Sequence, residues 1–303
     1  MSSRPRPAFG ISVVNGLTRR TLCTGLAASI AGVGMPACAT ERLRVRVAAI
    51  DWAMLETAIA MGVEVVAAAE LRLYRQMVVE PAMPPGVSDL GLRGSLNYEA
   101  LLRAAPDLIL SAPWYVKYQS NLSRIAPVHS FRIDQRGRSP YEPAMEAARE
   151  LGRLTGSGER AENLIIEVAA EISAQRERLA RRRGDAFCII NIGDPRHFRV
   201  FGADSMQGHV LDSLGLRNAW AGQTRYSAQA PVDLVSLANV GDADIIIVRP
   251  IPSDALRVLP ESPLWNALPA VAQGRVHVID PVNPFGGLPT ARRLARLLGN
   301  ALA

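Results

Sequence analysis

Short apolar runs alternate with amphipathic segments along most of this chain. Residues 43–50 first alternate between apolar and polar positions and then become continuously apolar, which is typical of a strand that enters a buried sheet. Residues 52–61 have helical spacing, with Asp51 as a candidate N-cap and Gly62 as a stop. Further apolar runs, such as residues 108–111, continue the alternation. The pattern therefore predicts an α/β fold with central sheets flanked by helices.

The longest helical pattern lies in the middle of the chain. Apolar residues recur at helical spacing between Ser157, a candidate N-cap, and Gly184, a stop. This predicts a helix of roughly 25 residues, about 38 Å long, either as a bridge between two lobes or as a surface helix of the second lobe. The order of elements after it repeats the order before it. We therefore expect an N-terminal lobe at residues 40–155, an interlobe helix within residues 156–184 and a C-terminal lobe at residues 185–303.

The first 39 residues predict an export signal. Arg19 and Arg20 form a twin arginine, an apolar run follows, and Ala37-Cys38-Ala39 supplies a cleavage pattern of small residues. A lipid anchor at Cys38 and a buried N-terminal helix are the alternatives. Removing residues 1–39 takes away four arginines and no acid, which lowers the net charge from +6 to +2. No basic stripe with interleaved aromatic residues is present, so a nucleic-acid partner is not expected.

Motifs that carry catalysis are absent from the sequence. There is no glycine-rich phosphate loop after the signal, no nucleophile elbow and no cysteine pair, because Cys188 is the only cysteine after residue 39. The four histidines have no metal-ligand spacing: His129, His197, His209 and His277. This pattern favours an exported binding protein over its rival, an exported enzyme on a doubly wound fold.

Two loops carry candidate ligand contacts. Arg93 lies between Gly91 and Gly94, which favour a sharp turn, so its forked donors could point into a cleft rather than along a helix face. A surface arginine is the alternative. Trp114 and Tyr115 belong to the densest aromatic stretch of the chain and follow the predicted strand 108–111, at the end of a strand where α/β sheets bind ligands.

Several short motifs are distributed over the chain after the predicted signal. They are Gly91, Glu99-Ala100-Leu101, Pro106-Asp107-Leu108-Ile109, Asp242-Ala243-Asp244-Ile245-Ile246 and Trp265 through Gly274-Arg275-Val276. By these motifs the chain resembles the substrate-binding proteins of ABC importers for iron–siderophore complexes, haem and cobalamin. A second set lies at residues 89–93, 124–127, 194–197, 200–202 and 218–220. By this set the chain is most similar, within that family, to the periplasmic ferric hydroxamate-binding proteins of Gram-negative bacteria.

The resemblance implies roles for single residues. Arg93 matches the arginine that bonds the hydroxamate oxygens around the iron, and either Trp114 or Tyr115 matches a pocket tyrosine. Further candidates stand at or beside positions where family members carry large aromatic residues, or in the loop at residues 280–287: Met77, Tyr226, Asn283 and Phe285. Fewer large aromatic residues than usual imply a wider, more polar cleft.

The resemblance also implies a function and its partners. We expect a monomeric periplasmic protein that delivers a ferric hydroxamate-type siderophore to an ABC permease in the inner membrane. The siderophore would supply all the iron ligands, so no protein cofactor, metal site or catalysis is expected. Another iron chelate, haem or a corrinoid is the alternative ligand. Family members dock on the permease through an acidic residue on each lobe, and at the corresponding positions this chain has Ser120 and Val235.

Overall fold

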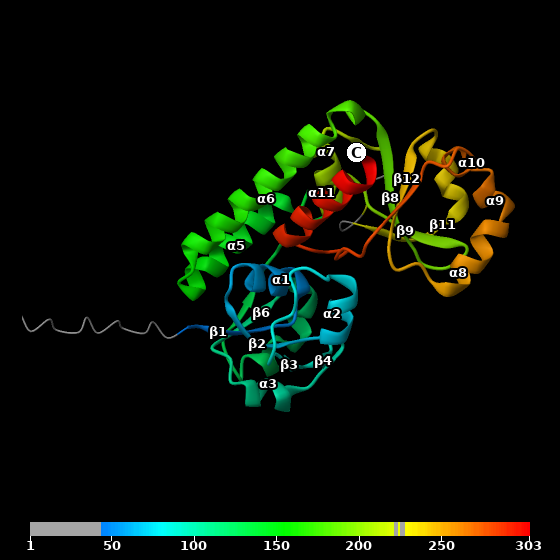
Figure 1. The fold of residues 1–303 in the computed structure, drawn as a ribbon. Helices are drawn as coiled ribbons and strands as arrows, with labels where there is room; N and C mark the ends of the chain where they lie inside the picture. Colours follow the sequence, from blue (N-terminus) through cyan, green and yellow to red (C-terminus); the bar gives the residue numbers. More distant parts are fainter. Residues whose placement is uncertain (1–43, 221–223, 225–227) are drawn as a thin grey trace, which may run out of the picture. The chain divides into compact units, whose positions relative to one another are not determined.

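A computed structural model describes residues 44–220, 224 and 228–303, and the predicted signal lies outside this part of the chain. The first lobe is built on a parallel sheet of five strands in the order β3-β2-β1-β6-β7 (Figure 1). Its central strand is completely buried at three of four positions, as expected for a strand covered on both faces. The bounds are β1 Arg46–Ala49, β2 Glu64–Ala68, β3 Ser88–Asp89, β6 Leu108–Ser111 and β7 Val128–Ser130.

Helices and a hairpin follow these strands in the first lobe. Asp51 caps α1 as predicted, because its side chain accepts from the Met54 amide. The polar and proline positions of residues 71–85 favour irregular structure, yet this segment begins with helix α2, where Leu71 and Tyr74 are buried. The aromatic stretch that follows β6 contains a 3₁₀ helix. The bounds are α1 Trp52–Ala60, α2 Leu71–Met77, β4 Gly91–Leu92, β5 Ser95–Leu96, α3 Tyr98–Ala104, η1 Pro113–Tyr118 and α4 Gln119–Leu122.

Two helices lead from the first sheet to the second. Helix α5 (Tyr141–Thr155) ends at Gly156, whose φ of 68° suits a glycine. Helix α6 (Gly158–Arg178) has 21 residues, fewer than predicted, because the last turn before Gly184 tightens into the 3₁₀ helix η2 (Ala180–Arg182). Ser157 occupies the N-cap position, but its side chain makes no capping hydrogen bond.

The second lobe has a mixed sheet in the order β11-β9-β8-β12-β13, with β10 also paired to β8. Strands β8 and β9 form an antiparallel hairpin, whereas β12 runs parallel to β8 and β13. The strands are β8 Ala186–Ile192, β9 His197–Val200, β10 Arg217–Asn218, β11 Gln229–Asp233, β12 Asp244–Val248 and β13 Val276–Ile279. The helices are α7 Met206–Ser213, η3 Leu234–Val240, α8 Ser253–Val258, η4 Leu259–Glu261, α9 Pro263–Asn266, α10 Pro269–Ala272 and α11 Leu288–Leu302.

A shared layer of helices joins the two lobes. Helix α11 belongs to the second lobe in sequence, yet it packs against α6, α7 and α1 (Figure 1). One apolar cluster includes buried residues of both sheets and of these helices, from Val47 in β1 to Ile279 in β13. Such a continuous core resists large movements between its parts, because interiors are close-packed. Within the described residues, no helix has the length and apolar character needed to cross a membrane.

Candidate ligand-binding site

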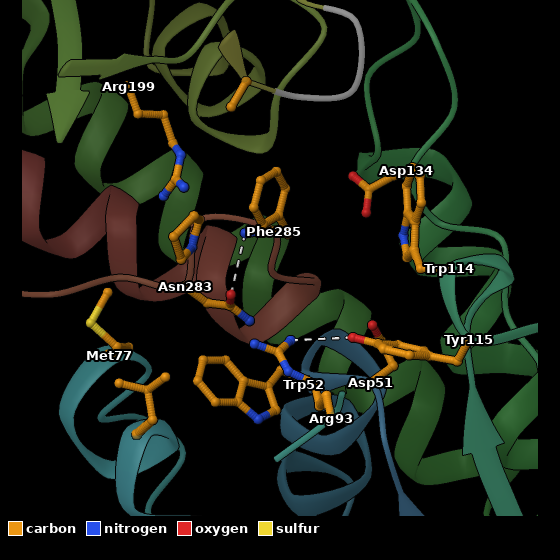
Figure 2. Close-up of a pocket in the computed structure, with 13 residues that line it drawn as sticks. Asp51, Trp52, Met77, Arg93, Trp114, Tyr115, Asp134, Arg199, Asn283 and Phe285 are labelled. Carbon is orange, nitrogen blue, oxygen red and sulfur yellow. Dashed lines mark hydrogen bonds between the residues drawn. The ribbon is translucent and has the colours of Figure 1, made fainter. Parts of the chain in front are cut away.

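A cavity of about 630 Å³ lies between loops of the two lobes, within the size range of small-molecule sites (Figure 2). The first lobe contributes the start of α1, α2, the turn between β4 and β5, η1 and the segment that follows β7. The second lobe contributes β9 and the loop before α11. The lining residues are Asp51, Trp52, Leu73, Met77, Arg93, Trp114, Tyr115, Asp134, Arg199, Ala228, Asn283, Pro284 and Phe285.

Arg93 lies at the turn of the β4–β5 hairpin, where Glu70 and Trp52 hold it in place. Its Nε donates to Glu70 Oε2 at 2.7 Å, and its backbone amide donates to Glu70 Oε1 at 3.2 Å. Its guanidinium carbon lies 4.3 Å from the centre of the Trp52 ring, in cation–π geometry. Gly91 adopts a φ of 71°, as its loop position predicted, whereas Gly94 stays outside the left-handed region. The guanidinium is therefore oriented before any ligand arrives.

Trp52 and Asp51 line the cavity next to this arginine (Figure 2). The Trp52 indole donates to the Ala69 carbonyl at 3.0 Å and packs edge-on against Tyr74, so its ring is fixed. Burial and, to a smaller extent, the charge of Asp134 raise the pKa of Asp51 to about 6, while the hydrogen bond from the Met54 amide and the charge of Arg93 oppose the shift. A carboxyl with this pKa changes charge near the pH of mildly acidic surroundings.

The aromatic loop supplies a second wall. The Tyr115 hydroxyl accepts from Arg93 Nη1 at 3.3 Å, and burial raises the pKa of this phenol. Trp114 is 50% exposed and lines the same cavity. The sequence left open whether Trp114 or Tyr115 matches the pocket tyrosine. Both residues line the cavity, and Tyr115 is bonded to Arg93 through its hydroxyl.

The second lobe closes the cavity with one cation and one aromatic ring. The Arg199 guanidinium lies 5.6 Å from the centre of the Phe285 ring, and burial lowers the pKa of this arginine. Asn283 is 2% exposed, and its side-chain oxygen accepts from the Phe285 amide at 3.2 Å. The asparagine thereby shapes the turn that carries the ring.

The structure brings six of the seven predicted contact residues together at one cavity: Arg93, Trp114, Tyr115, Met77, Asn283 and Phe285. Tyr226 lies outside the described residues. The sequence did not single out Trp52, Leu73, Asp134 or Arg199, and it interpreted Asp51 only as a helix cap. The position of Asp51 and Trp52 directly after the first strand was the one signal that could have revealed them, since ligands bind beyond the carboxyl ends of such strands.

The pKa of Asp51 leads to a stability prediction. Because the folded-state pKa is about 6 and the unfolded value is about 3.9, the folded protein binds this proton more tightly. Protonated Asp51 therefore adds to the free energy of unfolding. This contribution is complete below about pH 4 and is lost as the pH rises through about 6. Asp51→Asn should therefore lose less stability than wild type between these pH values, while its amide oxygen still caps α1. Urea unfolding at half-unit pH steps measures this dependence of stability on pH.

Asp280→Asn is the control for this prediction, because Asp280 is an exposed carboxyl. Its stability should follow the wild-type curve of stability against pH. If the curve for Asp51→Asn ran parallel to the wild-type curve, the prediction would be contradicted.

The two lobes and the cavity between them define the class of protein as a two-lobed binding protein. Among the described residues, no group of three or more histidine, cysteine or acidic side chains could hold a metal ion. The chain belongs to the periplasmic binding protein family, whose sequence profile matches residues 47–282. This confirms the predicted resemblance and the α/β fold class.

Individual relatives carry more specific names. The chain is 30% identical over 257 residues to the iron(3+)-hydroxamate-binding protein FhuD of Escherichia coli (strain K12), covering 85% of this chain and 86% of the relative. The crystal structure of FhuD from Vibrio cholerae with Fe³⁺–Desferal bound superposes with a TM-score of 0.80 at 27% identity, covering 86% and 98% of the two chains. A shorter similarity, 28% over 137 residues, links the chain to the ferric-anguibactin-binding protein FatB of Vibrio anguillarum, over 45% and 42% of the two lengths.

Proposed function

We propose that this protein binds a ferric hydroxamate siderophore in the periplasm and delivers it to an ABC importer in the inner membrane. The observation that carries the proposal is the pre-oriented Arg93 at a 630 Å³ cavity. Hydroxamate oxygens around iron are compact acceptors, and a forked, charged donor binds such oxygens more strongly than a neutral one. The names of the FhuD relatives from Escherichia coli and Vibrio cholerae support the same ligand class.

The charges around the cavity support a neutral chelate. Asp51 and Asp134 accompany Arg93 and Arg199 in the lining, and Glu70 already pairs with Arg93. A ferric ion with three singly charged hydroxamates has no net charge, whereas three catecholates leave the complex strongly anionic. An anionic chelate would be repelled by Asp51, and Arg93, one of the two arginines in the lining, is already paired with Glu70. The lining therefore favours a hydroxamate over a catecholate.

The contact residues have distinct proposed roles. Arg93 and Tyr115 would bond the chelate oxygens, and Trp52, Trp114 and Phe285 would pack against its apolar parts. Met77 and Asn283 would complete the wall, and Tyr226 remains a candidate from the sequence alone. The iron would be held only through the siderophore. The proposed function requires no protein cofactor and no catalytic step.

The division of the chain is also part of the proposal. Residues 1–39 would direct export through the twin-arginine motif and then be removed. The lobes would comprise residues 40–155 and 185–303, with residues 156–184 between them. Mass spectrometry of the protein recovered from the periplasm would show a new N-terminus at Thr40; retention of residues 1–39 there would contradict this assignment.

A titration followed by tryptophan fluorescence tests the ligand class, because Trp52 and Trp114 line the cavity. The Fe³⁺ complex of Desferal should quench the mature protein saturably, with a Kd of about 1 μM or lower. A ferric tris-catecholate should bind at least about 100-fold more weakly, because its negative charge meets Asp51. This difference corresponds to about 2.8 kcal/mol of binding free energy, at 1.4 kcal/mol for each factor of ten. Binding of a catecholate, haem or a corrinoid without binding of any hydroxamate would overturn the ligand assignment and leave the family unchanged.

A further inference from the structure

A buried carboxylate of the first lobe reaches into the second lobe directly behind the cavity. Glu56 lies on α1, four residues after Trp52, and is completely buried. Its oxygens accept four hydrogen bonds from residues 283–290. The donors are the Gly287 amide at 2.6 Å, the Thr290 hydroxyl at 2.9 Å, the Asn283 side chain at 3.3 Å and the Thr290 amide at 3.4 Å.

These bonds supply a helix cap that the second lobe lacks. Helix α11 begins after Gly287, which has no side chain to cap the first turn, and Pro289 has no amide hydrogen to offer. Glu56 takes the Thr290 amide, the third residue of the helix, as an N-cap side chain normally would. The positive end of the α11 dipole also favours a carboxylate at this place.

The chain is shaped for this close approach. A Cβ at Gly286 would overlap the Thr290 side chain and lie 2.8 Å from Glu56 Oε1, and a Cβ at Gly287 would lie 3.1 Å from Thr57 Oγ1. Two consecutive glycines thus let residues 286 and 287 lie directly against α1. Burial raises the pKa of Glu56 to about 7, and its hydrogen bonds oppose that rise.

We propose that Glu56 is a positioning residue of the cleft, which holds the Asn283–Phe285 wall of the second lobe in register with Trp52 of the first. Glu56 is absent from the cavity lining, but Asn283 bonds both to Glu56 and to the amide of Phe285. The link therefore runs from α1 through Asn283 to the ring that closes the cavity. This inference rests on the proposed function only in requiring that the cleft takes a ligand.

The first test compares Glu56→Gln with Thr57→Val. Glutamine can still accept from the Gly287 and Thr290 amides, but its own NH₂ group would face the Asn283 donor. Glu56→Gln should therefore weaken binding of Fe³⁺–Desferal by about 10-fold. Thr57 is equally buried on the same helix, but its hydroxyl donates to the Ala53 carbonyl of that helix, so Thr57→Val should keep wild-type affinity. Unchanged affinity in Glu56→Gln would overturn the inference.

A double-variant cycle separates positioning from a general loss of stability. Phe285→Ala removes a half-exposed ring from the wall, and it should weaken binding less in the Glu56→Gln background, because the ring is no longer held in place there. We expect the change in Kd of the double variant to differ by at least about 3-fold from the product of the changes in the two single variants. In the Thr57→Val background the effect of Phe285→Ala should be unchanged. Purely multiplicative effects in both backgrounds would refute the positioning role.

Amide hydrogen exchange, measured on the protein without ligand, tests this inference separately from the proposed function. Amide hydrogen exchange of residues 286–291 should become faster in unliganded Glu56→Gln, whereas β12 should exchange at the wild-type rate. If the wild-type protein binds no hydroxamate, the proposed function fails, and the cycle is repeated with whichever chelate the protein binds. If exchange at residues 286–291 stays unchanged, the cap does not hold this wall and the inference fails.

Discussion

Arg93→Ala is expected to weaken binding of a ferric hydroxamate by at least about 100-fold, because it removes hydrogen bonds to a charged group that contribute about 1.5–3 kcal/mol each. The loss should be large because the guanidinium is already held by Glu70, Tyr115 and the Trp52 ring. A donor oriented before binding loses little conformational freedom when the ligand arrives. Tryptophan fluorescence titration or isothermal calorimetry measures the change.

Two further variants identify the cause of that loss. Arg93→Lys keeps the charge but not the planar fork, so its affinity should fall between those of wild type and Arg93→Ala. Arg103→Ala removes an exposed arginine of α3 that does not line the cavity, and this variant should bind as wild type does. Thermal unfolding of each variant is needed as well, because removing Arg93 leaves Glu70, whose side chain is 12% exposed, without its ion-pair partner. Affinity within about 3-fold of wild type for Arg93→Ala would contradict the assigned role, since it corresponds to less than 1 kcal/mol.

Gly208→Ala is expected to destabilise the protein by about 3 kcal/mol, the upper end of the usual range for an overfilled core. Gly208 lies on α7, where a Cβ would overlap the carbonyl oxygen of Gly202 and lie 2.9 Å from Ala203 Cα. Both neighbours are backbone atoms, so no side-chain rotation relieves the overlap. The Ser205 side chain, which accepts from the Gly208 amide at 2.9 Å, ties the same turn to the helix. Urea unfolding and the melting temperature measure the loss.

Gly158→Ala is the matched control for this substitution. Gly158 begins α6 outside the left-handed region, and a Cβ there would have no heavy atom within 4 Å. Alanine favours a helix over glycine by up to about 1 kcal/mol, so this variant should be as stable as wild type or slightly more stable. A wild-type melting temperature for Gly208→Ala would show that residues 202–203 can move away from α7, contrary to the expectation.

The sequence by itself determined the elements that depend on near neighbours. The apolar spacing predicted the alternation of strands and helices and the two lobes, and Asp51 was identified as a cap because capping involves only the next three residues. Gly91 was expected to allow the turn that carries Arg93, and it does so at a φ of 71°. The local pattern and the resemblance together named six of the thirteen residues that line the cavity. The resemblance also added the expected ligand class, because short motifs remain recognisable one at a time.

Local pattern also misled in places. Residues 71–85 contain a cluster of polar residues and proline, which favours irregular structure, yet α2 forms because Leu71 and Tyr74 are buried against the first lobe. The long central helix was expected to continue to Arg183, but its last turn tightens after Leu179. For α2, burial against distant residues outweighed the preference of the local sequence.

Only the tertiary structure decided which distant residues meet. Glu70 holds Arg93 across 23 positions of sequence, and Glu56 caps a helix more than 200 residues away. Nothing in the spacing of α1 distinguishes Glu56 from an exposed polar residue, and nothing in the pattern around residue 199 brings Arg199 to the cavity. Pairing of this kind depends on how the sheets and the shared helical layer pack. Packing joins surfaces whose residues are far apart in the chain, whereas sequence periodicity reports only the few residues on either side.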